Sequence, residues 1–78
     1  MQTAQKVETF TGKVENVIDH KDIGWIETDA GEILFFHKNY TRAKKMPYSG
    51  QRVKGRIGRV ENEDTQARAY AVEVCNGN

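Results

Sequence analysis

The sequence predicts an all-β protein, a small barrel of five antiparallel strands with a long loop between the third and the fourth. Apolar and polar residues alternate through much of the chain, which is the two-residue period of half-buried strands. Polar or glycine-containing turns separate these segments, and the longest apolar run, residues 33–36, is far too short to span a membrane. Closure into a barrel is expected because so small a sheet cannot leave both edges open.

Five strand segments follow from this pattern. They are expected at residues 8–19, 23–28, 32–37, 51–60 and 66–75. Gly31 tolerates the positive φ of a tight turn, so the second and third strands are expected to form a hairpin. Gly12 and Gly55 are points where the sheet is able to curve, and a bulge is expected at Gly58. Five antiparallel strands closed in this way are typical of the OB-fold.

The segment between the third and fourth strands, residues 38–50, breaks the alternation. Asn39 is able to cap one or two helical turns that reach Lys45, and Pro47 would end them. The loop is therefore expected to be long and to contain a short helix.

The last strand follows a polar segment, residues 61–65, that is expected to be mobile. In this strand, alternation places Tyr70, Val72 and Val74 on one face, with the intervening residues on the other. Tyr70 is therefore expected to point in the same direction as the two valines.

The chain is expected to be one small domain. It spans residues 1–78, with a core at about residues 8–75 and flexible ends. Cys75 is the only cysteine, which excludes an internal disulfide and favours a reducing, cytoplasmic location. Residues 1–6 are polar and do not resemble a signal peptide, so the protein is expected to be soluble.

Charge is unevenly distributed along the chain. Residues 1–36 carry three Lys against seven acidic residues, whereas residues 37–60 carry eight Lys or Arg and no acid. Residues 61–78 are acidic again, and the net charge is only +1. The basic segment is either a contact for a polyanion or a solvated face balanced by the flanking strands. Arg56 and Arg59 likewise either extend a basic surface or pair with the acidic residues just after them.

Flat side chains gather on one face of the expected hairpin. Alternation turns Ile23 and Trp25 to one side, and across the turn Phe35 and His37 join them. Phe36 has the opposite parity and is expected in the core. Rings exposed on a sheet suit the stacking of nucleic-acid bases, so this face is a candidate binding surface.

Five short motifs, taken in order, resemble a cold-shock domain, a nucleic-acid-binding family with the OB-fold. They are G-K-V at residues 12–14, K-D-I-G-W-I at 21–26, L-F-F-H at 34–37, G-Q-R-V at 50–53 and the closing strand at 68–74. The second and third resemble the two ribonucleoprotein motifs of that family, K-G-F-G-F-I and V-F-V-H. The resemblance covers nearly the whole chain and implies that the ligand is single-stranded RNA or DNA.

The resemblance also implies the roles of individual residues. Trp25, Phe35 and His37 would stack on bases, with Ile23 on the same face and Lys21 beside them for phosphate. The basic loop and the fourth strand would supply a further electrostatic surface. Its candidates are Lys38, Tyr40, Arg42, Lys44, Lys45, Arg52, Lys54 and Arg56.

Several positions depart from the family pattern. Where the family's first strand continues K-W-F-N, this chain has E-N-V-I at residues 15–18, and Asp22, Ile23 and Lys38 replace a glycine and two phenylalanines. At about 1 kcal/mol for each missing ring, four missing rings would cost several powers of ten in affinity. Three interpretations follow: the domain binds weakly, its site lies toward the basic loop and fourth strand, or the fold serves another purpose.

The candidate side chains also have plainer interpretations. Trp25 is either a stacking residue or a half-buried sheet residue covered by the long loop. His37 stacks, contacts phosphate or does neither. Tyr40 and Tyr48 stand among the loop cations, and they either meet bases or pack onto the end of the barrel.

Catalysis and metal binding are not indicated. The sequence has no Ser/His/Asp or Cys/His grouping, and neither His20 nor His37 has a second ligand at zinc spacing. We therefore expect no enzyme activity, no cofactor and no membrane contact.

The expected function is low-specificity binding of single-stranded RNA or DNA, as a nucleic-acid chaperone or a regulator of transcription or translation. The alternative is a protein-interaction module with an eroded nucleic-acid face, which docks an acidic partner or a second copy of itself.

Overall fold

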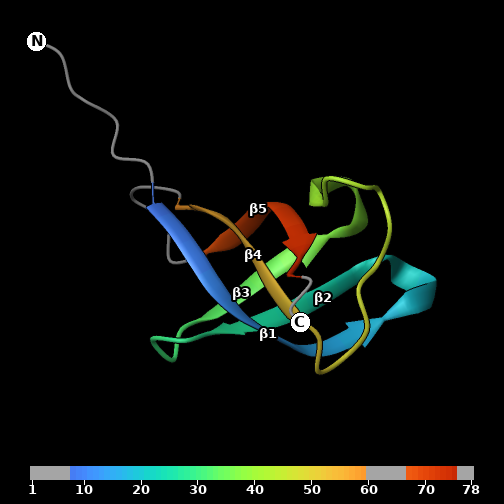
Figure 1. The fold of residues 1–78 in the computed structure, drawn as a ribbon. Helices are drawn as coiled ribbons and strands as arrows, with labels where there is room; N and C mark the ends of the chain where they lie inside the picture. Colours follow the sequence, from blue (N-terminus) through green and yellow to red (C-terminus); the bar gives the residue numbers. More distant parts are fainter. Residues whose placement is uncertain (1–7, 60–66, 76–78) are drawn as a thin grey trace, which may run out of the picture.

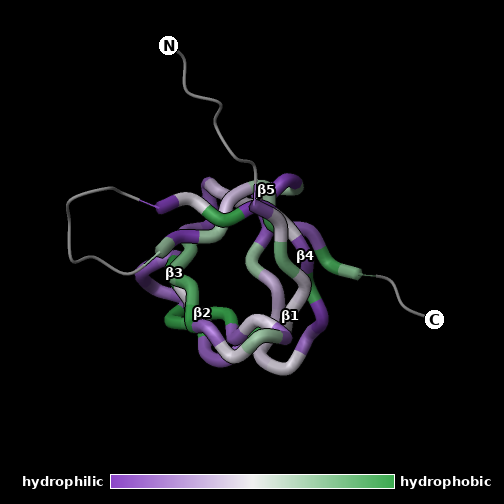
Figure 2. Tube along the Cα trace, turned by 90° about the vertical axis from the view of Figure 1, so that its left-hand side faces the viewer, coloured by the Kyte–Doolittle hydropathy of each residue, from purple (hydrophilic) through white to green (hydrophobic). Residues whose placement is uncertain are grey.

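The chain folds into a closed five-stranded β-barrel (Figure 1). The computed structural model describes residues 8–59 and 67–75. Its strands are β1 (Glu8–Ile18), β2 (Ile23–Thr28), β3 (Ile33–His37), β4 (Arg52–Gly58) and β5 (Arg68–Val74). Around the barrel they follow the order β1-β2-β3-β5-β4, and β4 pairs with β1 to close the ring, as Figure 2 shows end-on. The all-β barrel is confirmed, while the expected flexible ends and the mobile segment 61–65 lie outside the described residues.

The neighbours β3 and β5 run parallel, which corrects the expectation that all strands are antiparallel. The other four neighbouring pairs of the barrel are antiparallel. An odd number of strands cannot alternate in direction around a closed ring, so one pair has to be parallel. This β3–β5 seam is short: Phe35 pairs with Arg68, and the Phe35 amide donates to the Ala67 carbonyl at 3.0 Å.

Two irregularities in the ladders bend the strands. Glu15 is an extra residue on β1, because pairing resumes at Asn16 after Val14 while β2 advances by one residue. This bulge explains why strict alternation stops in the second half of β1. The second irregularity lies between β4 and β5, at Gly55 and not at Gly58 as expected.

The second irregularity changes the faces of β5. Between the pairs Lys54–Glu73 and Arg56–Tyr70, β4 has one residue, Gly55, whereas β5 has two, Ala71 and Val72. Ala71 has a φ of 52°. The chain reverses its parity there, so Tyr70 reaches the outer surface while Val72 stays in the core. The expectation that Tyr70 and Val72 share a face was therefore wrong.

Inward-facing residues of all five strands meet inside the barrel. Ile26, Leu34 and Phe36 have no exposed surface, which confirms that Phe36 is a core residue. Gly24 leaves room for the Phe36 ring, since a Cβ at this position would lie 2.7 Å from Phe36 Cε1. The other core residues are Phe10, Val14, Val53, Ala69 and Val72.

The long loop between β3 and β4 begins with a single 3-10 turn, η2 (Lys38–Tyr40), and the expected one or two helical turns from Asn39 to Lys45 do not form. The capping side chain is that of His37, whose Nδ1 accepts a hydrogen bond from the Asn39 amide at 3.0 Å. The chain then extends at Thr41, which forms a parallel bridge to Val72. This bridge draws the loop against β5, and a helix cannot continue through it.

The helical segments of the described residues are two 3-10 turns, η2 and η1 (Asp19–Lys21). The turn η1 ends at Asp22, which has a φ of 60° and leads into β2. Over residues 8–59 and 67–75, no helix has the length and apolar character that crossing a bilayer requires.

The two neighbouring phenylalanines of β3 allow a matched test of its faces. Phe36→Ala leaves a cavity in the core and is expected to lower the free energy of unfolding by about 3–5 kcal/mol. Phe35→Ala removes a half-buried ring from the outer face and is expected to cost about 1–2 kcal/mol. Urea denaturation followed by circular dichroism measures both, and equal losses would contradict the assignment of faces.

Candidate functional site

Trp25 and Phe35 lie side by side on the outer face of the barrel. They oppose each other in the β2–β3 ladder, and both side chains are half-buried. Their ring centroids are 6.0 Å apart, and the ring planes meet at 65°, an edge-to-face contact. The expected common face is present, although the two rings do not form one flat platform.

Further rings continue from this pair toward β5. His37 shares the outer face of β3 with Phe35, and its ring centroid lies 5.9 Å from that of Tyr40. The Tyr40 ring in turn lies 4.7 Å from Tyr70 of β5. We call these five residues, Trp25, Phe35, His37, Tyr40 and Tyr70, the ring row. The ring row crosses β2, β3, η2 and β5, and therefore also the β3–β5 seam.

Tyr70 was not among the candidates from the sequence. Alternation alone placed it with Val72, and the bulge at Ala71 that turns it outward leaves no clear signal in the residue types. Gly58 provides the space for its ring, because a Cβ at Gly58 would collide with Tyr70 Cε2. A glycine on the outer face of β4 was the one available hint that a neighbouring ring lies across it.

The β1 end of this face carries no ring. Asn16 opposes Trp25 at a position where the resembled family has an aromatic residue, and Ile18 opposes Ile23. Ile23 is half-buried and also opposes His37, so it belongs to the same face as expected. Lys21 is exposed in η1, two residues before Ile23. Polar and aliphatic groups therefore border the ring row on this side.

Cations border the ring row on the β5 and β4 side. Arg56 opposes Tyr70 in the β4–β5 ladder and is exposed. Arg68 opposes Phe35 across the seam, and its pKa is raised chiefly by Tyr70, with Tyr40 contributing. Arg56 was a sequence candidate, whereas Arg68 was missed because the parallel pairing of β5 with β3 was not foreseen.

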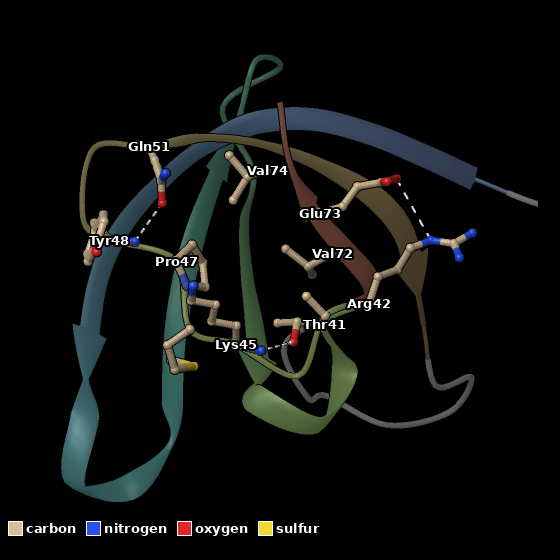
Figure 3. Close-up of a pocket in the computed structure, with 11 residues that line it drawn as sticks. Thr41, Arg42, Lys45, Pro47, Tyr48, Gln51, Val72, Glu73 and Val74 are labelled. Carbon is tan, nitrogen blue, oxygen red and sulfur yellow. Dashed lines mark hydrogen bonds and ion pairs between the residues drawn. The ribbon is translucent and has the colours of Figure 1, made fainter. Parts of the chain in front are cut away.

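The loop cations lie in a different place. Arg42 and Lys45 line a cavity of about 370 Å³ between the loop and β5 (Figure 3). Pro47 and the exposed Tyr48 come from the loop side of this cavity, and Arg42 lies 3.8 Å from Glu73 of β5. The remaining loop candidates are Lys38, which begins η2, and the exposed Lys44. The two loop tyrosines thus differ: Tyr40 packs partly against the core within the ring row, and Tyr48 stands apart from it.

Two basic residues of the fourth-strand region are held by carboxylates. Arg52 binds Asp29 through two nitrogens, at 2.9 and 3.0 Å. Arg59 binds both Glu8 and Glu32, with 2.7 Å to the latter. The acidic residues that follow Arg59, its expected partners, lie outside the described residues. For these two arginines the interpretation as a balanced, solvated face is correct.

The ion pairs shift the ionisation of the carboxylates that form them. The pKa of Asp29 falls from 3.8 to about 2, chiefly because Arg52 and then Thr11 donate hydrogen bonds to its carboxylate. Hydrogen bonds from Arg59 likewise lower the pKa of Glu32. Both pairs are exposed and each contributes little to stability, but together they connect β1, the β2–β3 turn and the β4 region.

Comparison with known proteins leaves the family of this chain open. No protein-family model matches the sequence, and no curated protein matches it either. Within the part of the chain that the structure describes, no three His, Cys, Asp or Glu side chains gather in a way that could hold a metal ion.

The Asp29–Arg52 pair gives a pH-dependent prediction. A lowered pKa in the folded state means that the pair stabilises the fold above about pH 4 and that this contribution is lost as the pH falls through about 2. Asp29→Asn is therefore expected to melt at a lower temperature than the native protein at pH 7, and the difference should close toward pH 2. Thermal melts followed by circular dichroism from pH 7 to pH 2 measure this, and a constant difference would contradict it.

Proposed function

We propose that the protein binds single-stranded RNA or DNA on the ring row, with low sequence preference and without catalysis. One observation carries the proposal: five rings follow one another across the outer face of a closed barrel, with Arg56 and Arg68 beside them. Rings stack on any base because every base has a π-face, and guanidinium groups meet phosphates. The sequence resemblance to cold-shock domains supports the same class of ligand.

Binding of this kind suits a nucleic-acid chaperone or a regulator of transcription or translation. The protein would act in the cytoplasm, where the thiol of Cys75 stays reduced. Asn16 in place of a ring opposite Trp25 removes one stacking position, and each stacked base is worth about 1–3 kcal/mol. We therefore expect a modest affinity that depends strongly on salt.

Titration of fluorescently labelled oligo-dT and oligo-rU, followed by anisotropy, tests this function. The native protein is expected to bind both strands, and Phe35→Ala to weaken binding by about 5- to 150-fold through the loss of one stacked base. Tyr48→Ala is the control, because it removes an exposed ring outside the ring row. Its affinity is expected to stay within about twofold of native.

Two outcomes would contradict the proposal. The first is no change in anisotropy at tens of micromolar protein, about the range in which non-specific binding is detected. The second is equal weakening by Phe35→Ala and Tyr48→Ala, which would exclude the ring row as the binding surface. Either result would favour the protein-interaction module, which size-exclusion chromatography with light scattering would then test for self-association.

A further inference from the structure

The ring row continues past the hairpin in one direction. Its shortest ring-to-ring distance, 4.7 Å, joins Tyr40 to Tyr70 across the β3–β5 seam. Tyr70 is also among the exposed large apolar side chains, with 36% of its surface accessible. A base stacked near His37 or Tyr40 therefore has a further ring within one stacking distance on β5.

The position of Tyr70 depends on two features of the backbone. The bulge at Ala71, with its φ of 52°, turns Tyr70 outward while Val72 stays in the core. Gly58 of β4 then leaves the space that the ring occupies, which any larger residue would fill.

The two sides of the ring row differ in charge. On the β5–β4 side, Arg56 opposes Tyr70, Arg68 opposes Phe35 across the seam, and the exposed Lys54 lies two residues before Arg56 on β4. Glu73, which opposes Lys54, lies within 3.8 Å of Arg42 and is the acidic member of this surface. On the β1 side, Asn16 opposes Trp25 and Ile18 opposes Ile23, and both are uncharged. The charged residues there are the acidic bulge residue Glu15 and the exposed Lys21, two residues before Ile23.

We propose that the bound strand leaves the hairpin across the β3–β5 seam, with a base on Tyr70 and phosphates facing Arg68 and Arg56, and does not cross β1. This inference rests on the proposed function and adds the direction of the strand across the ring row. The substitutions that remove rings from β1 are then matched by a ring and two cations on the opposite border. The binding surface is displaced around the barrel and is not simply reduced.

Chemical-shift mapping of the native protein is the first test. On addition of unlabelled oligo-dT, the amides of Tyr40, Arg68 and Tyr70 are expected to shift more than those of β1 between Glu15 and Ile18. This measurement needs no substitution and so does not depend on the folding of a variant. Larger shifts on β1 than on β5 would overturn the inference.

Variants on the two borders give the second test, with anisotropy of labelled oligo-dT as the readout. Tyr70→Ala is expected to weaken binding by about 5- to 150-fold, whereas Tyr70→Phe, which keeps the ring, should stay within about twofold of native. Gly58→Ala keeps the Tyr70 ring but displaces it, so this variant is expected to weaken binding. Asn16→Ala, on the β1 border, should have no more than about a twofold effect.

The outcomes distinguish failure of this inference from failure of the proposed function on which it rests. If Phe35→Ala weakens binding and Tyr70→Ala does not, the direction is wrong and the proposed function stands. If the native protein does not bind either strand, both fail. Arg56→Gln adds an independent check, because loss of one phosphate contact should lower the slope of log affinity against log salt by about 0.7.

Discussion

The number of strands constrains everything else on this surface. Five strands in a closed ring cannot all be antiparallel to their neighbours, and the pair that fails to alternate is β3 with β5. This parallel seam places the last strand beside the end of the hairpin, although 30 residues of chain separate Tyr40 from Tyr70. The contact between these two rings is a direct result of that closure. Without it, the ring row would end at η2.

The alternation of residue types predicted most of the fold. The bounds of β2 were predicted correctly, and β1 and β3 begin or end within one residue of the expected positions. The core position of Phe36 and the outward position of Trp25 followed from parity alone. These predictions hold because both residues lie in the β2–β3 ladder, which is regular, so the two-residue period applies without interruption.

The errors occur where the ladder is irregular or where a side chain replaces backbone pairing. Ala71 adopts a left-handed conformation that its type does not suggest, and this reversed the predicted face of Tyr70. His37, and not Asn39, caps the turn after β3, and the Thr41 bridge to Val72 stops the helix. Each of these depends on contacts between distant segments, which the local pattern does not contain.

The charge pattern was informative about composition but not about position. Cations of residues 37–60 lie in three different places: Arg52 and Arg59 are held by carboxylates, Arg42 and Lys45 line the cavity of the loop, and Arg56 lies beside the ring row. The two acidic residues of the β2–β3 turn, Asp29 and Glu32, are bound by Arg52 and Arg59. A linear block of charge therefore overstated the size of any single basic surface, and it omitted Arg68, which lies outside the block.

The tilt between neighbouring rings has a consequence for the shape of a ligand. The planes of Trp25 and Phe35 differ by 65°, and those of Tyr40 and Tyr70 by 43°. Inside a double helix, each base is stacked between its neighbours, so its faces are not free to stack on these rings. An unpaired chain is able to swivel each base about its own backbone torsions. On the proposed function, a surface of tilted rings would therefore favour unpaired strands without any hydrogen bond to a base edge.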